Sequence, residues 1–130
     1  MIPKKEADAR ELADQKGHSY LFGLDWNLDG DEIYVVDGQK FGSPTRFMNH
    51  SCNPNCKIVP VSTTDHGDDR IYHLAFFALR NIPPGTELTF DYNPLWDGTK
   101  KVDPNAVKCL CGEARCRGQL WPNARKKGPS

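Results

Sequence analysis

The sequence predicts a mostly β domain with small sheets, one helix near its amino end and long connections. Three observations predict this class. The 130 residues suit one domain, and 38% hydrophobic with 26% charged residues excludes a disordered chain. From residue 18 on, short runs of β-branched and aromatic residues alternate with Gly, Pro, Asn and Asp. Only residues 4–14 have a helical composition.

The helix is expected over residues 4–14. Proline is tolerated where it starts, Ala and Glu favour it, and Gly17 supplies a stop. Its apolar positions are Ala9, Leu12 and Ala13. Because this stripe is narrow, we expect the helix to lie on the surface of a sheet.

Strand-like segments follow the helix. They are residues 19–24, 32–36, 57–61, 70–79 and 87–92. Residues 70–79 are apolar on both alternating faces, which predicts a central buried strand. From residue 93 on, Gly, Pro, Asn and Lys dominate, so this tail has too few apolar residues to fold unaided.

Charge and hydropathy exclude some partners. Seventeen basic residues balance seventeen acidic ones, so we expect no strong nucleic-acid binding. The longest apolar run, residues 74–79, is far shorter than the roughly 20 residues of a membrane helix. The first residues lack a secretory signal. The acidic stretch at 25–37 is either a solvated loop or a receptor for a basic peptide.

The five cysteines are distributed unlike a disulfide framework. Three of them form a Cys-x-Cys-x4-Cys pattern at residues 109–116, which suits metal ligation in a reducing compartment. Structural zinc takes four ligands, so a fourth must come from elsewhere in the chain. Cys52 and Cys56 are the first candidates, and His50, His66 and His73 are the alternatives. Five buried or idle thiols are the opposing interpretation.

Two further segments carry polar or aromatic residues. In residues 46–56, His50 and Cys52 would form a nucleophilic pair, but we expect their side chains to point apart and find no orienting partner. A polar loop that places backbone groups and Asn49 around a ligand is the better hypothesis. Phe90 and Tyr92 share one face of a strand, an arrangement that by itself is typical of a core.

Together these motifs resemble the SET-domain protein-lysine methyltransferases. The shared motifs are Tyr-Leu-Phe-x-Leu-Asp at 20–25, Asn-His-Ser-Cys-x-Pro-Asn at 49–55, Glu-Leu-Thr-Phe-Asp-Tyr at 87–92 and the cysteine pattern at 109–116. The ending Cys-Arg-Gly-Gln-Leu-Trp at 116–121 resembles fungal members of the branch that methylates lysine 9 of histone H3. The resemblance runs from about residue 2 to residue 122.

The resemblance implies a fold and a domain order. It implies a SET domain over residues 1–96, a zinc-stabilised post-SET segment over 97–122 and a flexible basic tail over 123–130. In the family, the segment at residues 46–50 and the strand of Tyr92 pass through one another in a knot-like arrangement. Family members also have opening strands with a Gly-x-Gly loop, and this branch has a preceding cysteine-rich segment. These residues contain neither, so we expect the chain to be the carboxyl-terminal part of the domain.

The resemblance also implies site residues. Tyr92 matches the catalytic tyrosine, Tyr20 a second tyrosine of the lysine channel, and Phe90 the aromatic residue that limits methylation. The residues expected to hold S-adenosylmethionine are Arg46, Phe47, Asn49, His50 and Trp121. One structural zinc ion is expected on Cys52, Cys109, Cys111 and Cys116, which leaves Cys56 as a buried thiol.

The implied function is methyl transfer from S-adenosylmethionine to lysine 9 of histone H3. Di- or trimethylation is expected because Phe90 lacks the hydroxyl of a tyrosine. The histone tail is expected to enter as an added strand, on chromatin in the nucleus. The alternatives are a catalytically inactive SET remnant that acts as a binding module, and a methyltransferase of non-histone lysines.

Overall fold

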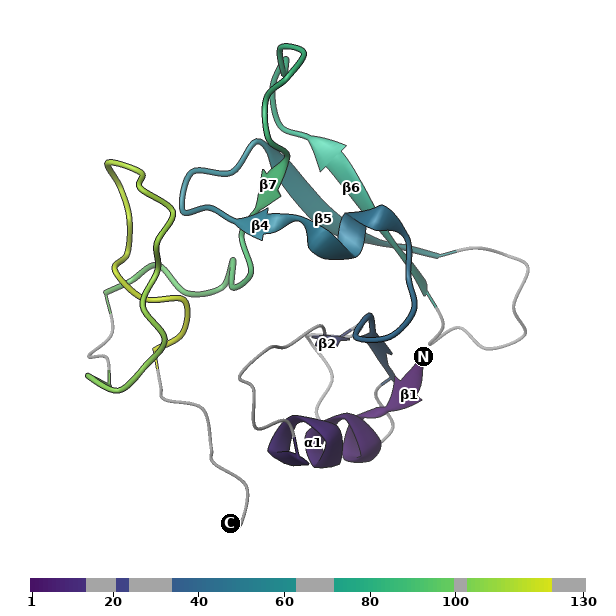
Figure 1. Cartoon of the computed structure of the whole chain (residues 1–130). Coiled ribbons are helices and arrows are strands. Elements are labelled where there is room, and N and C mark those ends of the chain that lie inside the picture. The colour runs from purple at the N-terminus through teal and green to yellow at the C-terminus, as the bar shows by residue number, and fades with distance from the viewer. Residues whose placement is uncertain (14–20, 24–33, 63–71, 100–102, 123–130) are drawn as a thin grey trace. The chain divides into compact units, whose positions relative to one another are not determined.

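The computed structural model describes residues 1–13, 21–23, 34–62, 72–99 and 103–122 (Figure 1). Its elements are β1 (Ile2–Pro3), α1 (Lys4–Ala13), β2 (Leu21–Gly23), β3 (Tyr34–Asp37), η1 (Pro44–Phe47), β4 (Asn49–His50), β5 (Cys56–Ser62), β6 (Tyr72–Ala78) and β7 (Thr89–Phe90). The strands form one three-stranded sheet, in the order β1-β3-β2, and two pairs, β4-β7 and β5-β6. The expectation of a mostly β chain with one helix is confirmed.

The chain divides into two compact units. The described residues of Met1–Arg46 and Val59–Ala75 form the first unit, and those of Phe47–Ile58 and Phe76–Arg125 form the second. Within the described residues, no helix is long and apolar enough to cross a membrane.

In the first unit, α1 matches the expected helix and packs against β1 and β3. Arg10 pairs with Glu6 one turn away and donates from Nη1 to Asp37 Oδ2 at 2.6 Å. The expected apolar stripe is wrong at its start, because Ala7 is buried and Ala9 is exposed. Ala7 lies three residues before Arg10, so the two residues share one face of α1. The bond from Arg10 to Asp37 of β3 holds this face against the sheet.

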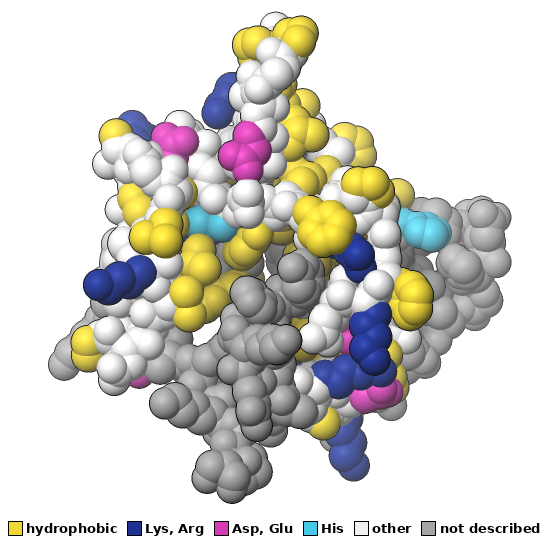
Figure 2. Space-filling view, viewed as in Figure 1, with side chains coloured by type: hydrophobic (Ala, Val, Ile, Leu, Met, Phe, Trp, Pro, Cys, Tyr) yellow, Lys and Arg dark blue, Asp and Glu magenta, His cyan; other side chains and the backbone are white. Residues whose placement is uncertain are grey.

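The strand predictions had mixed outcomes. The segments at 57–61 and 70–79 form β5 and β6, whereas only Thr89–Phe90 of the segment at 87–92 is a strand. The prediction of a central buried strand at 70–79 is wrong: Phe77 and Leu79 are 54% and 53% exposed. In the described part of the chain β6 pairs with β5 alone, so alternating apolar residues do not bury both of its faces. Figure 2 shows apolar side chains gathered around the segment that joins β6 to β7.

The second unit is organised by the parallel pairing of β4 with β7 (Figure 1). Asn49 lies opposite Thr89, and His50 lies opposite Phe90. The ladder continues past β4, where the Ser51 N–H donates to the Phe90 carbonyl at 3.1 Å. Two motifs that are far apart in the sequence therefore lie side by side, and each fixes the position of the other.

The side chain of Asn55 holds β7 from a second side. It is 5% exposed, and its Nδ2 donates to the Glu87 carbonyl at 2.8 Å. Its Oδ1 accepts the Thr89 N–H at 2.9 Å. The amide thus pairs with two backbone groups of the neighbouring segment as another strand would.

Replacing Asn55 by alanine is expected to lower the free energy of unfolding by about 2 kcal/mol, because two part-buried backbone groups lose their partners. The measurement is chemical denaturation of the metal-loaded chain. Asn53, which is exposed, supplies the matched control Asn53→Ala, with an expected change below about 0.5 kcal/mol. Equal denaturation midpoints for the two variants would contradict the role of the Asn55 amide.

Candidate functional site

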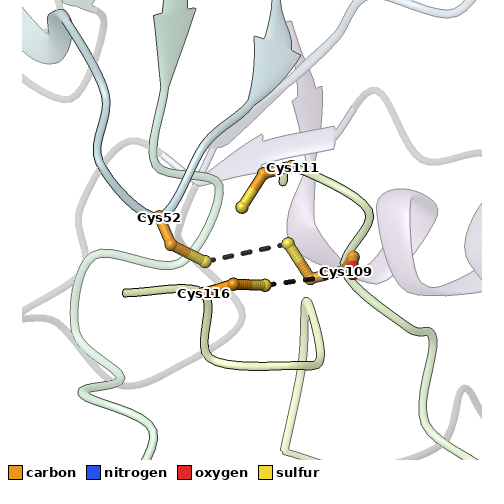
Figure 3. A group of neighbouring side chains, drawn as sticks. All are labelled: Cys52, Cys109, Cys111 and Cys116. Carbon is orange, nitrogen blue, oxygen red and sulfur yellow. Dashed lines mark hydrogen bonds between the residues drawn. The ribbon is translucent and has the colours of Figure 1, made fainter. Parts of the chain in front are cut away.

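Four cysteines from two segments meet in the second unit (Figure 3). One sulfur atom from each of Cys52, Cys109, Cys111 and Cys116 lies within 4.8 Å of the other three. The Sγ atoms of Cys52 and Cys109 are 3.7 Å apart, and none of the described cysteines forms a disulfide. Cys56 is buried outside this group, which we call the thiol cluster. The four residues brought together are those that the resemblance implied.

The thiol cluster suits a metal ion by its chemistry as well as its spacing. Sulfur atoms around a tetrahedral zinc ion lie about 3.8 Å apart, given Zn–S bonds of about 2.3 Å. Burial and hydrogen bonds from neighbouring thiols raise the pKa of Cys109 to about 12. Cys111 differs: burial opposes ionisation there, but backbone N–H groups of Cys52 and Glu113 bring its pKa down to about 6. Four thiolates this close require a cation, so the cluster can hold a metal ion.

His50 connects the thiol cluster to Tyr92. Its ring is almost fully buried, and burial is the main cause that lowers its pKa; the charge of Asp91 opposes this shift, and that of Arg117 adds to it. The Tyr92 N–H donates to Nδ1 at 3.0 Å, so the proton of the neutral ring is on Nε2. Nε2 lies 3.3 Å from Cys52 Sγ.

The expectation that His50 and Cys52 point apart is therefore wrong. Side chains two residues apart on extended backbone point to the same face. Their contact does not make a nucleophilic pair, because Cys52 belongs to the thiol cluster. His50 serves there as a hydrogen-bond donor to sulfur.

The aromatic residues of the second unit form a connected group. Phe90 is 3% exposed, and its ring lies 5.0 Å from that of Phe76 and 4.9 Å from that of Tyr92. The Tyr92 ring meets the His50 ring edge-on at 5.2 Å. Its hydroxyl donates to the Met48 carbonyl at 2.7 Å. The hydroxyl is thereby fixed beside the backbone of the Asn-His motif.

Asp91, directly before Tyr92, accepts a bidentate ion pair from Arg117. Nη2 donates to Asp91 Oδ1 at 2.8 Å and Nη1 to Oδ2 at 3.1 Å. Nη1 also donates to the Trp96 carbonyl at 2.6 Å. Arg117 follows the last cysteine of the thiol cluster, so a charged contact joins that loop to the segment after β7 that carries Tyr92.

A pocket of about 570 Å³ opens beside these groups in the second unit. Asn49, His50 and Tyr92 line it, together with Leu110 and Leu120. Two leucines from the cysteine-rich loop thus share a cavity with the Asn-His motif and Tyr92. The rest of the lining is mostly polar or charged, with Arg80, Glu87 and Lys108 among its residues, so the pocket suits a ligand that has both an apolar part and several hydrogen-bonding groups.

The remaining expected site residues are spread more widely. Arg46 belongs to the first unit, where its Nη1 donates to the Gly38 carbonyl at 3.2 Å. In the second unit, Phe47 is 63% exposed and Trp121 is half-buried, and neither lines the pocket. Tyr20 lies outside the described residues, and so do residues 25–33 of the acidic stretch.

Sequence reasoning missed three structural residues of this site. Asn55, Asp91 and Arg117 each stand inside a motif that was recognised, but none was assigned a contact. Asp91, an acidic residue between the aromatic residues Phe90 and Tyr92, was the available signal, because a half-buried carboxylate needs a partner. Nothing local indicated that the partner is Arg117.

The family model described as "SET domain" matches residues 1–93. The chain belongs to the SET-domain family. The "Histone-lysine N-methyltransferase, H3 lysine-9 specific dim-5" of Neurospora crassa is 42% identical over 93% of this chain and 41% of its own length. The "Histone-lysine N-methyltransferase, H3 lysine-9 specific" of Schizosaccharomyces pombe is 44% identical over 93% of this chain and 26% of its own length. The chain thus spans less than half of either relative.

A solved structure agrees with this SET-domain assignment. It was reported under the words "Structural basis for the product specificity of histone lysine methyltransferases". It superposes with a TM-score of 0.72 at 46% identity, over 93% of this chain and 44% of that one. The resemblance stated from the motifs is confirmed for the family and the fold.

Proposed function

We propose that this SET domain transfers methyl groups from S-adenosylmethionine to lysine 9 of the histone H3 tail, on chromatin in the nucleus. The family and the names of its relatives support this proposal. The observation that carries it is the position of Tyr92. Its hydroxyl is held at the Met48 carbonyl, and its ring lies between Phe90 and His50 beside the pocket.

The pocket is the proposed place of the cofactor. S-adenosylmethionine supplies a methyl group on a positively charged sulfur, which an amine can attack. Asn49 and His50 line the pocket. Arg46, Phe47 and Trp121 do not line it, and we assign them to cofactor binding from their motif positions alone. The Asn49 amide is oriented by its hydrogen bond to Glu87 Oε1 at 2.6 Å.

The aromatic group gives the lysine its reactive form. A lysine amine has an ordinary pKa near 10.4, so at pH 8 deprotonation costs about 3 kcal/mol. Apolar rings disfavour the ammonium and lower that cost. We assign this task to Phe90 and Tyr92, with Tyr20 as the further channel tyrosine. The Tyr92 hydroxyl orients the amine, and carbonyls such as that of Met48 can accept the polarised methyl hydrogens.

The thiol cluster has an architectural role in this proposal. One zinc ion on its four cysteines would clamp the post-SET segment at 97–122 to the SET domain at 1–96. Zinc stabilises folded structure there and takes no part in the bond change. The basic tail at 123–130 lies outside the described residues.

The test is methyl transfer from labelled S-adenosylmethionine to an H3 tail peptide by the zinc-loaded chain. A peptide with alanine in place of lysine 9 is the control and is expected to accept no label. Equal labelling of both peptides would contradict the choice of lysine. Labelling of non-histone peptides alone would favour the non-histone alternative, and cofactor binding without any transfer would favour an inactive binding module.

Replacing Phe90 by tyrosine is expected to stop the reaction at the monomethyl product. The added hydroxyl would hold a water molecule in a position that is 3% exposed and crowd the methylated amine. Mass spectrometry of the peptide product measures this, with di- and trimethyl products expected for the natural chain. Phe77→Tyr is the control, because Phe77 is 54% exposed. Trimethyl product from Phe90→Tyr would contradict the assignment.

A further inference from the structure

We propose that Arg117 is a positioning residue that ties Tyr92 to the thiol cluster. The inference rests on the proposed function, since its effect is read in methyl transfer. It concerns how the cysteine-rich loop acts on the reaction. In this view the loop lines the pocket and also sets the position of the segment after β7 that carries Tyr92.

The guanidinium of Arg117 bonds to the segment that follows β7. The side chain is 10% exposed, and both its terminal nitrogens bond to the Asp91 carboxylate. Nη1 also donates to the carbonyls of Asn93 at 3.1 Å and Trp96 at 2.6 Å. One side chain thus bonds to residues on both sides of Tyr92. A planar, bidentate donor fixes both distance and angle, which a single-point charge does not.

The backbone of Arg117 faces the thiol cluster. Its N–H donates to Cys52 Sγ at 3.4 Å. His50 contacts the same sulfur through Nε2, while its Nδ1 accepts the Tyr92 N–H. Tyr92 is therefore connected to Cys52 by two routes, one through the His50 ring and one through Arg117 and Asp91. A displacement of the cysteine loop would alter both.

The Arg117 side chain also contacts Trp96 and Gly98. Its guanidinium carbon lies 5.3 Å from the centre of the Trp96 ring, and Trp96 is 5% exposed. Gly98, with a φ of 83°, also lies close to this side chain: a Cβ there would stand 3.1 Å from the Arg117 Cγ. A stacked ring, a glycine and a carboxylate together make a fitted slot for an arginine.

Loss of the guanidinium would leave the Asp91 carboxylate half-buried without its cation. The segment from Asp91 to Asn93 would then shift, and the Tyr92 hydroxyl with it. Because misplacement of a reacting group acts on the chemical step, kcat should fall while KM for the peptide changes little. If Arg117 only stabilised the fold, its loss would instead lower the fraction of folded protein. The kcat of each molecule that still folds would then be unchanged.

The experiment compares Arg117→Gln with Arg115→Gln, an exposed arginine of the same loop, in the zinc-loaded full chain. For Arg117→Gln we expect a kcat roughly 10- to 100-fold lower, with KM for the H3 peptide within about twofold. Hydrogen exchange at the Tyr92 amide should accelerate about tenfold, because its bond to His50 loosens. Metal content, measured by mass spectrometry, should remain one ion per chain. Arg115→Gln should match the natural chain in every measurement.

Two results would overturn the inference. One is an unchanged kcat in metal-loaded Arg117→Gln, and the other is unchanged Tyr92 amide exchange. Should Arg117→Gln lose its metal, Asp91→Asn breaks the same ion pair away from the cysteines, and the same pattern is required of it. An inactive natural chain would count against the proposed function, while the exchange measurement would still decide the role of Arg117.

Discussion

Replacing Tyr92 by phenylalanine is expected to lower kcat for methyl transfer by roughly 100-fold or more, as does loss of one preorganised polar group at a reacting centre. The hydroxyl is held by the Met48 carbonyl at 2.7 Å, so it is oriented before any ligand binds. Phenylalanine keeps the ring contacts with Phe90 and His50 but has no group that could orient the amine. The measurement is single-turnover transfer to the H3 tail peptide.

Binding and folding should be nearly unaffected by this change. One lost hydrogen bond at a half-buried hydroxyl costs about 1 kcal/mol of the free energy of unfolding. Affinity for S-adenosylhomocysteine, measured by calorimetry, should stay within about threefold, a difference below about 1 kcal/mol. Transfer at the natural rate by Tyr92→Phe would remove Tyr92 from the mechanism. A natural chain as inactive as the variant would instead support the binding-module alternative.

The sequence was informative where a signal is local. Ala, Glu and a flanking proline mark α1, β-branched residues mark β5, and aromatic residues mark β6, because these preferences act within a few residues. The pairing of β4 with β7 left no such signal. Each strand has two residues, and a parallel pair joins segments that are distant in sequence. The burial of β6 was overestimated for a related reason: an apolar pattern describes a strand's two faces and not what covers them.

The candidate site shows the same limit. Spacing alone grouped Cys109, Cys111 and Cys116, because ligands of one metal ion often lie close in sequence. The identity of the fourth cysteine came from the resemblance, and the structure brings Cys52 to that place. The contact between Asp91 and Arg117 could not be predicted, since an ion pair between distant residues has no periodicity and no spacing rule.

Removing the metal is expected to unfold the cysteine-rich loop and abolish methyl transfer. In the described residues 103–122, regular pairing is limited to the bridge between Lys108 and Gln119. Most of the cohesion must then come from the thiol cluster, and structural zinc contributes roughly 10–16 kcal/mol in small domains. Chelation should release one zinc ion per chain, raise the rate of amide exchange across this loop and stop methyl transfer. Added zinc should restore both the slow exchange and the transfer.

Two cysteine variants separate the metal from thiol chemistry in general. Cys111→Ser removes the thiol with a pKa of about 6, and a serine hydroxyl does not ionise near neutral pH. Its zinc content and activity should fall together, at least about tenfold in zinc affinity. Cys56→Ala changes a buried cysteine outside the thiol cluster, so it should keep one zinc ion and its activity despite some loss of stability. Full zinc content in Cys111→Ser, or its loss in Cys56→Ala, would mean that the metal is held by another set of ligands.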